Sequence, residues 1–234
     1  MVNTIHTIEE RILYQSDACV VVNKLPGEAV EGAKTASEDL PKALAERLGA
    51  AEGTLFAVHR LDVPVSGCCL FARSTAAFLF LSNAFSDRRT EKRYWAIVEK
   101  AAESVASVWR ELVHYVITDT KRNKSMAYEE AGPGRKQAVL RYRAVGEGER
   151  YSFLEIELIT GRHHQIRAQL ARVGLRIKGD LKYGARRSDP NGGIRLHAYS
   201  LAFPDPSGNG ETIRVHGLPP LQDRLWQAFP QEME

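Results

Sequence analysis

The sequence has few cysteines and no long apolar run. Its three cysteines, Cys19, Cys68 and Cys69, are odd in number, and none stands in a CxxC pair. This usage argues against a disulfide framework or a zinc site and fits a reducing cytosol. No apolar stretch approaches the roughly 20 residues of a membrane span, and residues 1–15 contain no apolar signal core. We therefore expect a cytoplasmic protein without a membrane segment.

Internal repeats, low-complexity tracts and linkers are also absent from the sequence. The 234 residues are 44% apolar and 26% charged, which is ordinary for a globular protein. A chain of this length buries a sizeable core as one large domain. We therefore expect residues 1–234 to form a single domain.

The net charge of +3 is small, but the basic residues are concentrated in one stretch. Residues 160–187 contain eight lysines and arginines against Asp180 alone, a net charge of +7, which leaves −4 for the rest of the chain. A basic stretch on an otherwise acidic chain points to a surface that binds a polyanion such as nucleic acid. The alternative is a solvated helix face and loop without a partner.

Hydrophobic patterning predicts more strands than helices. Several strands are joined by short turns, which favours an α+β domain around a largely antiparallel sheet. Residues 118–135 have few apolar side chains and are expected to form an exposed loop, a candidate contact for nucleic acid. The predicted strands are 17–23, 67–72, 94–99, 108–118, 137–145, 151–159 and 197–204, and the predicted helices are 36–49 and 74–86, with Ser37 and Ser74 as N-caps, 163–173 and 221–229.

Side-chain spacing adds two finer predictions. Leucine and isoleucine alternate with glutamate over residues 154–158, so we expect a strand with one buried face and one wet face that includes Glu155. In the helix over 163–173, apolar residues at helical spacing are expected to point inward, Val173 among them.

The segment His59-Arg-Leu-Asp-Val-Pro-Val-Ser-Gly67 places Asp62 between a basic pair and a Pro/Gly turn, just before an apolar strand. Loops at strand ends often hold catalytic groups, which makes Asp62 a candidate catalytic carboxylate. Taken alone, the segment also fits a turn aspartate that binds nearby backbone amides, and that interpretation is the commoner one for such a residue.

The segment Thr160-Gly-Arg-His-His-Gln-Ile-Arg167 runs from a strand end into a helix. A helix N-terminus presents backbone N–H groups and a positive dipole end, which suit a phosphate or carboxylate. Arg167 lies about one turn into the helix. His163 and His164 are adjacent and are expected to point in different directions. Two ligands of one metal ion would need i,i+3 or i,i+4 spacing, so no zinc site is expected.

In chain order, these segments and others resemble the motifs of RluA-type RNA pseudouridine synthases. Tyr94, which alone fits an ordinary half-buried aromatic at a strand start, belongs to one of them. The motifs occur in the family's order over residues 17–204. The matching segments are His59-Arg-Leu-Asp62 with Ser66-Gly67 (HRLDxxxSG), Lys92-Arg-Tyr94-Trp-Ala96 (K-x-Y-x-A), Thr160–Arg167 (TGRxHQIR), Gly179-Asp-Leu-Lys-Tyr-Gly184 (GDxxYG), Leu196-His-Ala198 (LHA) and Val21-Val-Asn-Lys24 with Gly27 (V-x-N-K-P-x-G).

The resemblance implies the pseudouridine synthase fold, a mixed, largely antiparallel sheet flanked by helices and loops, with an active-site cleft across the sheet. It implies a monomeric isomerase that converts uridine to pseudouridine in ribosomal or transfer RNA, by base flipping and without a metal ion or cofactor. Asp62 would be the essential carboxylate, Arg167 its basic partner and Tyr94 the active-site tyrosine. The other implied RNA contacts are Arg60, which would fill the space of the extruded base, and His59, Arg162, His163, His164, Gln165, Lys178 and Lys182.

The sequence departs from the family pattern beside the candidate carboxylate. Val63-Pro-Val65 stands where Lys-Asp-Thr is frequent, which removes a hydroxyl group and stiffens the loop through Pro64. The match begins near residue 17, so we do not expect the N-terminal S4 RNA-binding domain that is common in the family. Two other functions stay open: a catalytically inactive RNA-binding or RNA-folding protein on the same fold, and a hydrolase, although nucleophile–base partners are missing.

Overall fold

A computed structural model describes residues 7–30, 38–51, 53–101, 104–190, 192–220 and 223–229. Packing contacts divide the chain into two compact units, the first made of residues 1–92 and 197–223 and the second of residues 93–196 and 224–234. The single domain expected over residues 1–234 therefore stays a prediction.

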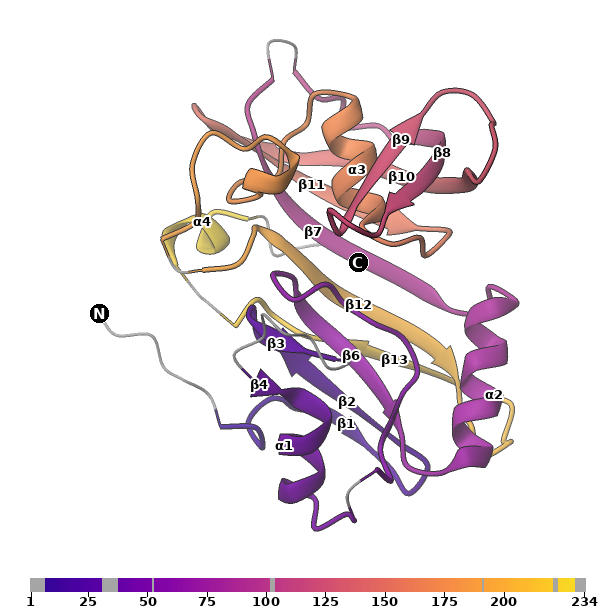
Figure 1. Cartoon of the computed structure of the whole chain (residues 1–234). Coiled ribbons are helices and arrows are strands. Elements are labelled where there is room, and N and C mark those ends of the chain that lie inside the picture. The colour runs from indigo at the N-terminus through magenta and orange to yellow at the C-terminus, as the bar shows by residue number, and fades with distance from the viewer. Residues whose placement is uncertain are drawn as a thin grey trace. The chain divides into compact units, whose positions relative to one another are not determined.

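The first unit is built on a sheet in the order β1-β2-β6-β12 (Figure 1). β13 extends it beyond β12, and β5 pairs with β6. All pairs in this sheet are antiparallel except β6 with β12. The strands are β1 (Ile12–Gln15), β2 (Cys19–Lys24), β5 (Phe56–Ala57), β6 (Ser66–Ala72), β12 (Leu196–Pro204) and β13 (Thr212–His216), and a separate parallel pair consists of β3 (Glu28–Ala29) and β4 (Glu38–Asp39).

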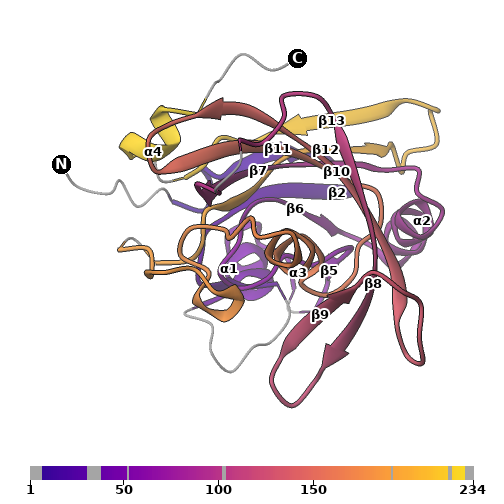
Figure 2. The same cartoon turned by 90° about the horizontal axis from the view of Figure 1, so that it is seen from above.

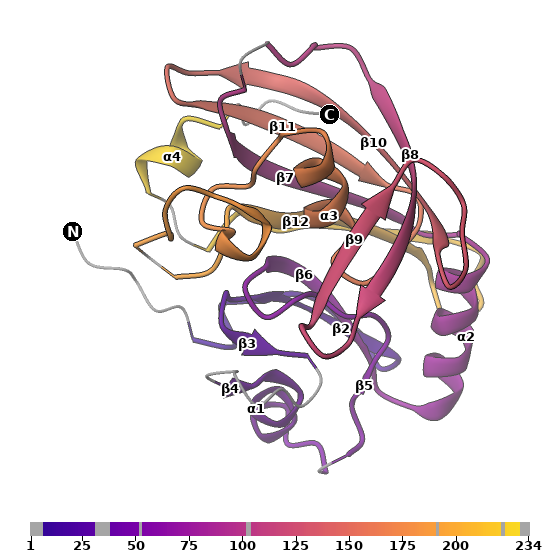
Figure 3. The same ribbon diagram turned by 45° about the horizontal axis from the view of Figure 1, so that its top comes forward.

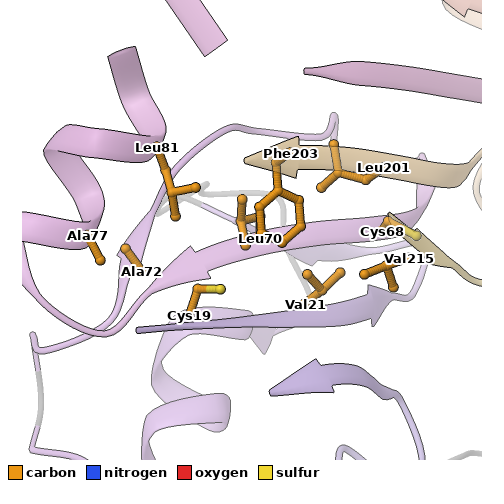
Figure 4. Close-up of a cluster of buried hydrophobic side chains, with 10 residues drawn as sticks. All are labelled: Cys19, Val21, Cys68, Leu70, Ala72, Ala77, Leu81, Leu201, Phe203 and Val215. Atoms are coloured by element: carbon orange, nitrogen blue, oxygen red, sulfur yellow. The ribbon is translucent and has the colours of Figure 1, made fainter. Parts of the chain in front are cut away.

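Helix α2 (Thr75–Ser86) covers the apolar core of this unit. Figure 4 shows Ala77 and Leu81 of α2 directed toward strand residues that include Leu70 and Phe203. The helix begins as the sequence predicts, because the side chain of Ser74 accepts a hydrogen bond from the backbone N–H of Ala77. The predicted N-cap is thus confirmed.

Helix α1 (Leu40–Arg47) is shorter than the helix predicted over 36–49. Residues 38 and 39 pair in β4 instead, so Asp39 becomes the N-cap and Pro41 falls in the first turn, where proline is tolerated. Ser37, the predicted N-cap, lies outside the described residues.

The second unit is built on an antiparallel sheet in the order β7-β11-β10-β8-β9. Helix α3 (Gln165–Arg172) packs beside β8 and β9 (Figures 2 and 3). The remaining helical pieces are η1 (Leu181–Tyr183) and α4 (Arg224–Gln227). The strands are β7 (Glu91–Glu99), β8 (Arg110–Asp119), β9 (Lys124–Tyr128), β10 (Lys136–Glu147) and β11 (Tyr151–Leu158).

The α+β class with mostly antiparallel strands is confirmed, but the loop predicted over 118–135 is only partly right, because it is confined to the turn after β8 and to residues 129–135. Its first part forms a hairpin in which β9 pairs with β8. The inward residues of β9 are Ser125 and Ala127, which are too small or polar to give a hydrophobic signal. The terminal helix predicted over 221–229 is reduced to α4, and residues 221 and 222 lie outside the described residues.

Two burial predictions are also wrong. Glu155, expected on a wet face, is fully buried (0% exposed), where its carboxylate pairs with Arg93 at 3.2 Å and with Arg143 at 2.7 Å. Val173, expected to point inward, follows the end of α3 and is 39% exposed. Among the described residues, no helix is both long and apolar enough to cross a membrane.

Candidate active site

Asp62 lies in a tight turn of the first unit, immediately before β6. The backbone N–H of Val65 donates to the carbonyl oxygen of Asp62 at 2.9 Å, and the N–H of Gly27 donates to the carbonyl oxygen of Val63 at 2.8 Å. The Asp62 side chain is half-buried. The turn is therefore held by its own hydrogen bond and by the loop that follows β2.

The strand after the turn is fixed at its first two residues. The hydroxyl of Ser66 bonds to Nδ1 of the buried His197 at 2.8 Å. Gly67 has a φ of +122°, and a Cβ atom there would lie 2.3 Å from the carbonyl oxygen of Ala198 in β12. Only glycine permits this approach, so the Ser-Gly pair anchors the turn that carries Asp62.

The two residues of the basic pair before Asp62 differ in environment. Nε2 of His59 accepts a hydrogen bond from the N–H of Leu70 at 3.2 Å, and the ring stacks on Phe85 at 5.0 Å. Burial, and then the charge of Lys92, lowers the pKa of His59 to about 3. A neutral imidazole that is bonded inside its unit braces the turn, whereas the neighbouring Arg60 is exposed.

In the second unit, Tyr94 is a buried residue of β7 opposite Ile156 of β11. Pairing with β11 fixes its backbone. Tyr94 and Arg167 belong to a different unit from Asp62, so the expected grouping of these three side chains stays a prediction.

Arg167 is held by a carboxylate that carried no assigned role in the sequence. Its Nε donates to Oδ2 of Asp180 at 2.7 Å and its Nη2 to Oδ1 at 2.8 Å, and the two residues are 4% and 2% exposed. The guanidinium also lies 4.9 Å from the ring centre of Tyr183. Asp180 is the lone acid of the basic stretch 160–187, which was the available sequence signal for this pairing.

The adjacent histidines stack on each other, so the prediction that they point in different directions is wrong. Their ring centres are 3.8 Å apart at 22°. Neither lies within α3, because His164 has a left-handed backbone (φ 50°) just before the helix. Nδ1 of His163 bonds to the hydroxyl of Ser125 at 2.8 Å, and Nδ1 of His164 to the hydroxyl of Tyr183 at 3.0 Å. The pair links the start of α3 to β9 and η1.

Gln165 closes the turn that leads into α3. Its Oε1 accepts hydrogen bonds from the hydroxyl of Thr160 at 2.8 Å and from the N–H of Arg162 at 2.9 Å. The Arg162 side chain remains exposed. Within the described parts of the chain, no cluster of histidine, cysteine or acidic side chains has the form of a metal site.

The basic stretch carries less uncompensated charge than its sequence suggests. Besides Arg167, three of its cations pair with carboxylates of the second unit, the half-buried Lys178 with Asp189 at 2.5 Å among them. Lys182 is exposed, and its amine donates to the carbonyl oxygen of Asn123, in the turn between β8 and β9, at 3.0 Å. That turn adds the exposed Lys121 and Arg122.

Comparisons with known proteins agree on one family. The sequence model described as RNA pseudouridylate synthase matches residues 18–172. The chain is 28% identical over 95% of its length to 69% of ribosomal large subunit pseudouridine synthase C of Vibrio parahaemolyticus. It is 31% identical over 92% of its length to 67% of the protein of the same name from Escherichia coli O157:H7. It is 29% identical over 95% of its length to 95% of tRNA pseudouridine synthase C of Haemophilus ducreyi.

Solved structures show the same fold. Human RNA pseudouridylate synthase domain containing 1 aligns with a TM-score of 0.72 at 24% identity, over 88% of this chain and 82% of that one. Human RNA pseudouridylate synthase domain containing 4 aligns with a TM-score of 0.70 at 22% identity, over 94% and 91%. At these identities the likeness concerns the fold.

Proposed function

The chain belongs to the RNA pseudouridylate synthase family, and from this premise we propose that Asp62 is its catalytic carboxylate. The enzyme is an isomerase that makes pseudouridine in RNA. The bond from C1′ of the ribose to N1 of uracil breaks, the base turns, and a bond forms between C1′ and C5. The hydrogen on C5 is released to solvent and N1 gains a proton, so the atoms balance without a cofactor.

A carboxylate suits this reaction because the sugar acquires oxocarbenium character when the bond to N1 breaks. A carboxylate stabilises such a charge or attacks C1′, as in retaining glycosidases. The turn that carries Asp62 is braced on both sides by hydrogen bonds and by the Gly67 contact. A rigid support of this kind keeps a catalytic group in its productive position, which is the observation that carries the proposal.

Tyr94 and Arg167 are proposed to act with Asp62. A tyrosine ring packs on a uracil ring, and its hydroxyl moves a proton. A guanidinium keeps a nearby carboxylate ionised and oriented. The target uridine is proposed to leave the base stack, because C1′ and C5 are inaccessible in a stacked strand. The exposed Arg60 is the residue proposed to take its place.

Exposed cations of the second unit are proposed to bind the RNA phosphates. Lys121, Arg122 and Lys182 come from the β8–β9 turn and from η1, and the bond from Lys182 to Asn123 joins the two segments. Arg162 and the half-buried His163 adjoin them through the bond between Nε2 of His163 and the side chain of Asn123 at 3.1 Å. We call Lys121, Arg122, Arg162 and Lys182 the hairpin patch.

Tritium release tests the activity and the role of Asp62 together. RNA labelled with tritium at C5 of uridine is incubated with the wild type, with Asp62→Asn and with Asp87→Asn, which changes an exposed aspartate after α2. We expect release from the wild type and the Asp87 variant, and loss of at least about 1000-fold in the Asp62 variant. Circular dichroism establishes that all three are folded. Release that survives Asp62→Asn would exclude the catalytic role of Asp62.

Separate pools of ribosomal and transfer RNA identify the substrate class, because relatives carry both kinds of name. RNA binding without release from either pool would instead support the inactive RNA-binding protein. Release that is unchanged in the presence of EDTA is expected, since the proposed chemistry uses no metal ion. Sedimentation with and without RNA tests the expected monomer.

A further inference from the structure

Lys24, at the end of β2, is a lysine with no exposed surface (0%). Its amine donates to the carbonyl oxygens of Leu25 at 2.9 Å, Val63 at 3.1 Å and Val65 at 2.7 Å. A fully buried lysine is rare, because its charge loses hydration. Here the three donors of an ammonium group meet three acceptors, so the site is built for the protonated form.

Two of these acceptors belong to the turn that carries Asp62. Val63 is the residue after Asp62, and Val65 lies three residues after it. The carbonyl of Val63 also accepts the N–H of Gly27. The amine therefore ties the loop after β2 to the backbone on the C-terminal side of Asp62. Without it, the carbonyl oxygen of Val65 would lose its lysine donor, and that of Val63 would keep the N–H of Gly27.

We propose that Lys24 is a positioning residue for Asp62, and that the turn keeps its catalytic form only while the Lys24 amine is protonated. The inference rests on the proposed role of Asp62. A neutral amine has two N–H donors and one lone pair. On losing its proton, Lys24 would no longer donate to one of the three carbonyl oxygens and would turn a lone pair toward it. The turn would then relax, and Lys24 would no longer carry the positive charge that attracts the Asp62 carboxylate.

The surroundings place this proton loss within an accessible pH range. Burial lowers the pKa of Lys24 to about 8, while Cys69, Glu28 and Asp62 oppose the shift and Arg11 adds to it. The charge of Arg11 is itself paired with Glu28 at 2.8 Å, and Glu28 accepts the N–H of Leu25 at 2.7 Å. These are the charged and titratable groups that act on the amine.

Catalysis and stability are then expected to respond in opposite directions to alkaline pH. Protonated Lys24 predominates below pH 8, so kcat should fall as the pH rises through about 8. In the unfolded chain the amine keeps its proton up to about 10.5. Between these values the unfolded state binds more protons, so the contribution of Lys24 to stability rises with pH. A loss of kcat in this window is therefore not explained by unfolding through Lys24.

The test measures kcat and KM by tritium release from pH 6.5 to 10 for the wild type, Lys24→Met and Glu28→Gln, with circular dichroism at each pH. The wild type should lose kcat with a one-proton slope near pH 8. Lys24→Met should be about 100-fold slower, with KM within about twofold, and should lack this step. Glu28→Gln should move the step to lower pH, because a charge that favours the ammonium is removed. A wild-type kcat in Lys24→Met, or the same step in it, would overturn the proposal.

A second measurement does not depend on the folding of the variants. Lysine labelled with 13C at Cε is titrated by NMR in Lys92→Arg protein, because Lys92 is another lysine whose pKa burial lowers. One signal should titrate near pH 8, at the midpoint of the kcat step. If no lysine signal titrates with a midpoint below pH 9, the proposal is refuted. If no RNA shows release at all, the proposed function fails, while this titration still decides the state of Lys24.

Discussion

Arg167 and Asp180 form a bidentate ion pair in which both side chains are almost completely buried. Asp180 lies on the loop before η1, and the ring of Tyr183 from η1 lies beside the same guanidinium. The GDxxYG segment therefore supplies both a carboxylate and a ring that orient Arg167. A bidentate partner fixes the plane of a guanidinium as well as its charge.

Removal of the carboxylate charge should impair catalysis more than RNA binding. We expect Asp180→Asn to lower kcat about 100-fold, since small displacements of a catalytic group have effects of this size. KM for RNA should change less than about threefold. The variant should also lose about 3 kcal/mol of unfolding free energy, because a buried charge loses its partner. Tritium release and urea unfolding measure these quantities.

A second ion pair of the same unit provides the matched control. Asp189 binds Arg195 through Nε at 2.6 Å and Nη2 at 3.1 Å, and both are buried. Asp189→Asn should be destabilised comparably but keep kcat close to that of the wild type. Equal kcat losses in the two variants would show that stability, rather than the orientation of Arg167, explains the first result.

The hairpin patch should determine the salt dependence of RNA binding. Each phosphate contact contributes roughly one unit to the slope of log K against log salt concentration. We expect Lys121→Ala with Arg122→Ala to weaken binding and to reduce this slope by about 1 to 2 units, with kcat unchanged at saturating RNA. Filter binding at several salt concentrations provides the measurement.

Arg150 supplies the control for this experiment. It is exposed in the β10–β11 turn, and the antiparallel register places that turn at the opposite end of the sheet of the second unit from the β8–β9 turn. Arg150→Ala should leave the slope unchanged. If Arg150→Ala lowers the slope as much as the double substitution does, the salt dependence would reflect the overall positive charge of the protein and not the hairpin patch.

Elements with a strong local signal were predictable from the sequence. Helix α2 has a serine cap and apolar residues at helical spacing, and β10 and β11 flank a short turn. Strand β9 gave no such signal, since it depends on pairing with β8 and on Tyr183, whose hydroxyl bonds the backbone N–H and carbonyl of Ser125. Burial of Glu155 depends likewise on arginines of two other strands.

The sequence motifs single out candidates for the site, which remain a prediction, but not the residues that support them. Motif order singled out Asp62, Tyr94 and Arg167. The contacts of Lys24 with Val63 and Val65 join residues about forty positions apart, as the separations of 39 and 41 show. No local pattern reports a pairing at that distance, so the braces of the turn became visible only in the folded chain. For Arg167 the sequence offered one signal, the lone acid Asp180 of its basic stretch, but not the bidentate geometry.

Gly67→Ala should destabilise the first unit. The new Cβ would meet three backbone atoms of Ala198 at 2.3 to 2.7 Å, and backbone cannot swing aside as a flexible side chain does. The positive φ adds strain. We expect a loss of more than about 1 kcal/mol of unfolding free energy, measured by urea unfolding. Gly208→Ala, at φ +82° with open space around it, should be affected less. Equal losses of unfolding free energy in the two variants would show that the positive φ alone, and not the contact with Ala198, causes the destabilisation.

His197 should make stability sensitive to mild acid. Its Nε2 donates to the carbonyl oxygen of Gly217 at 2.8 Å, so Nδ1 of the neutral ring accepts the hydroxyl of Ser66. Burial lowers its pKa from 6.5 to about 4. Between these values the unfolded chain binds the extra proton, so this stabilisation is present above pH 6.5 and is lost as the pH falls toward 4.

The expected loss over that window is about 3 kcal/mol, since one pKa unit corresponds to about 1.4 kcal/mol. Urea unfolding at half-unit steps from pH 7 to pH 4 measures it. In His197→Gln the amide keeps a donor and an acceptor but does not titrate, so the curve should flatten by this amount although the variant is less stable at pH 7. A pH dependence that is the same in both proteins would assign the acid sensitivity to other groups, with His59 the first to examine because burial lowers its pKa to about 3.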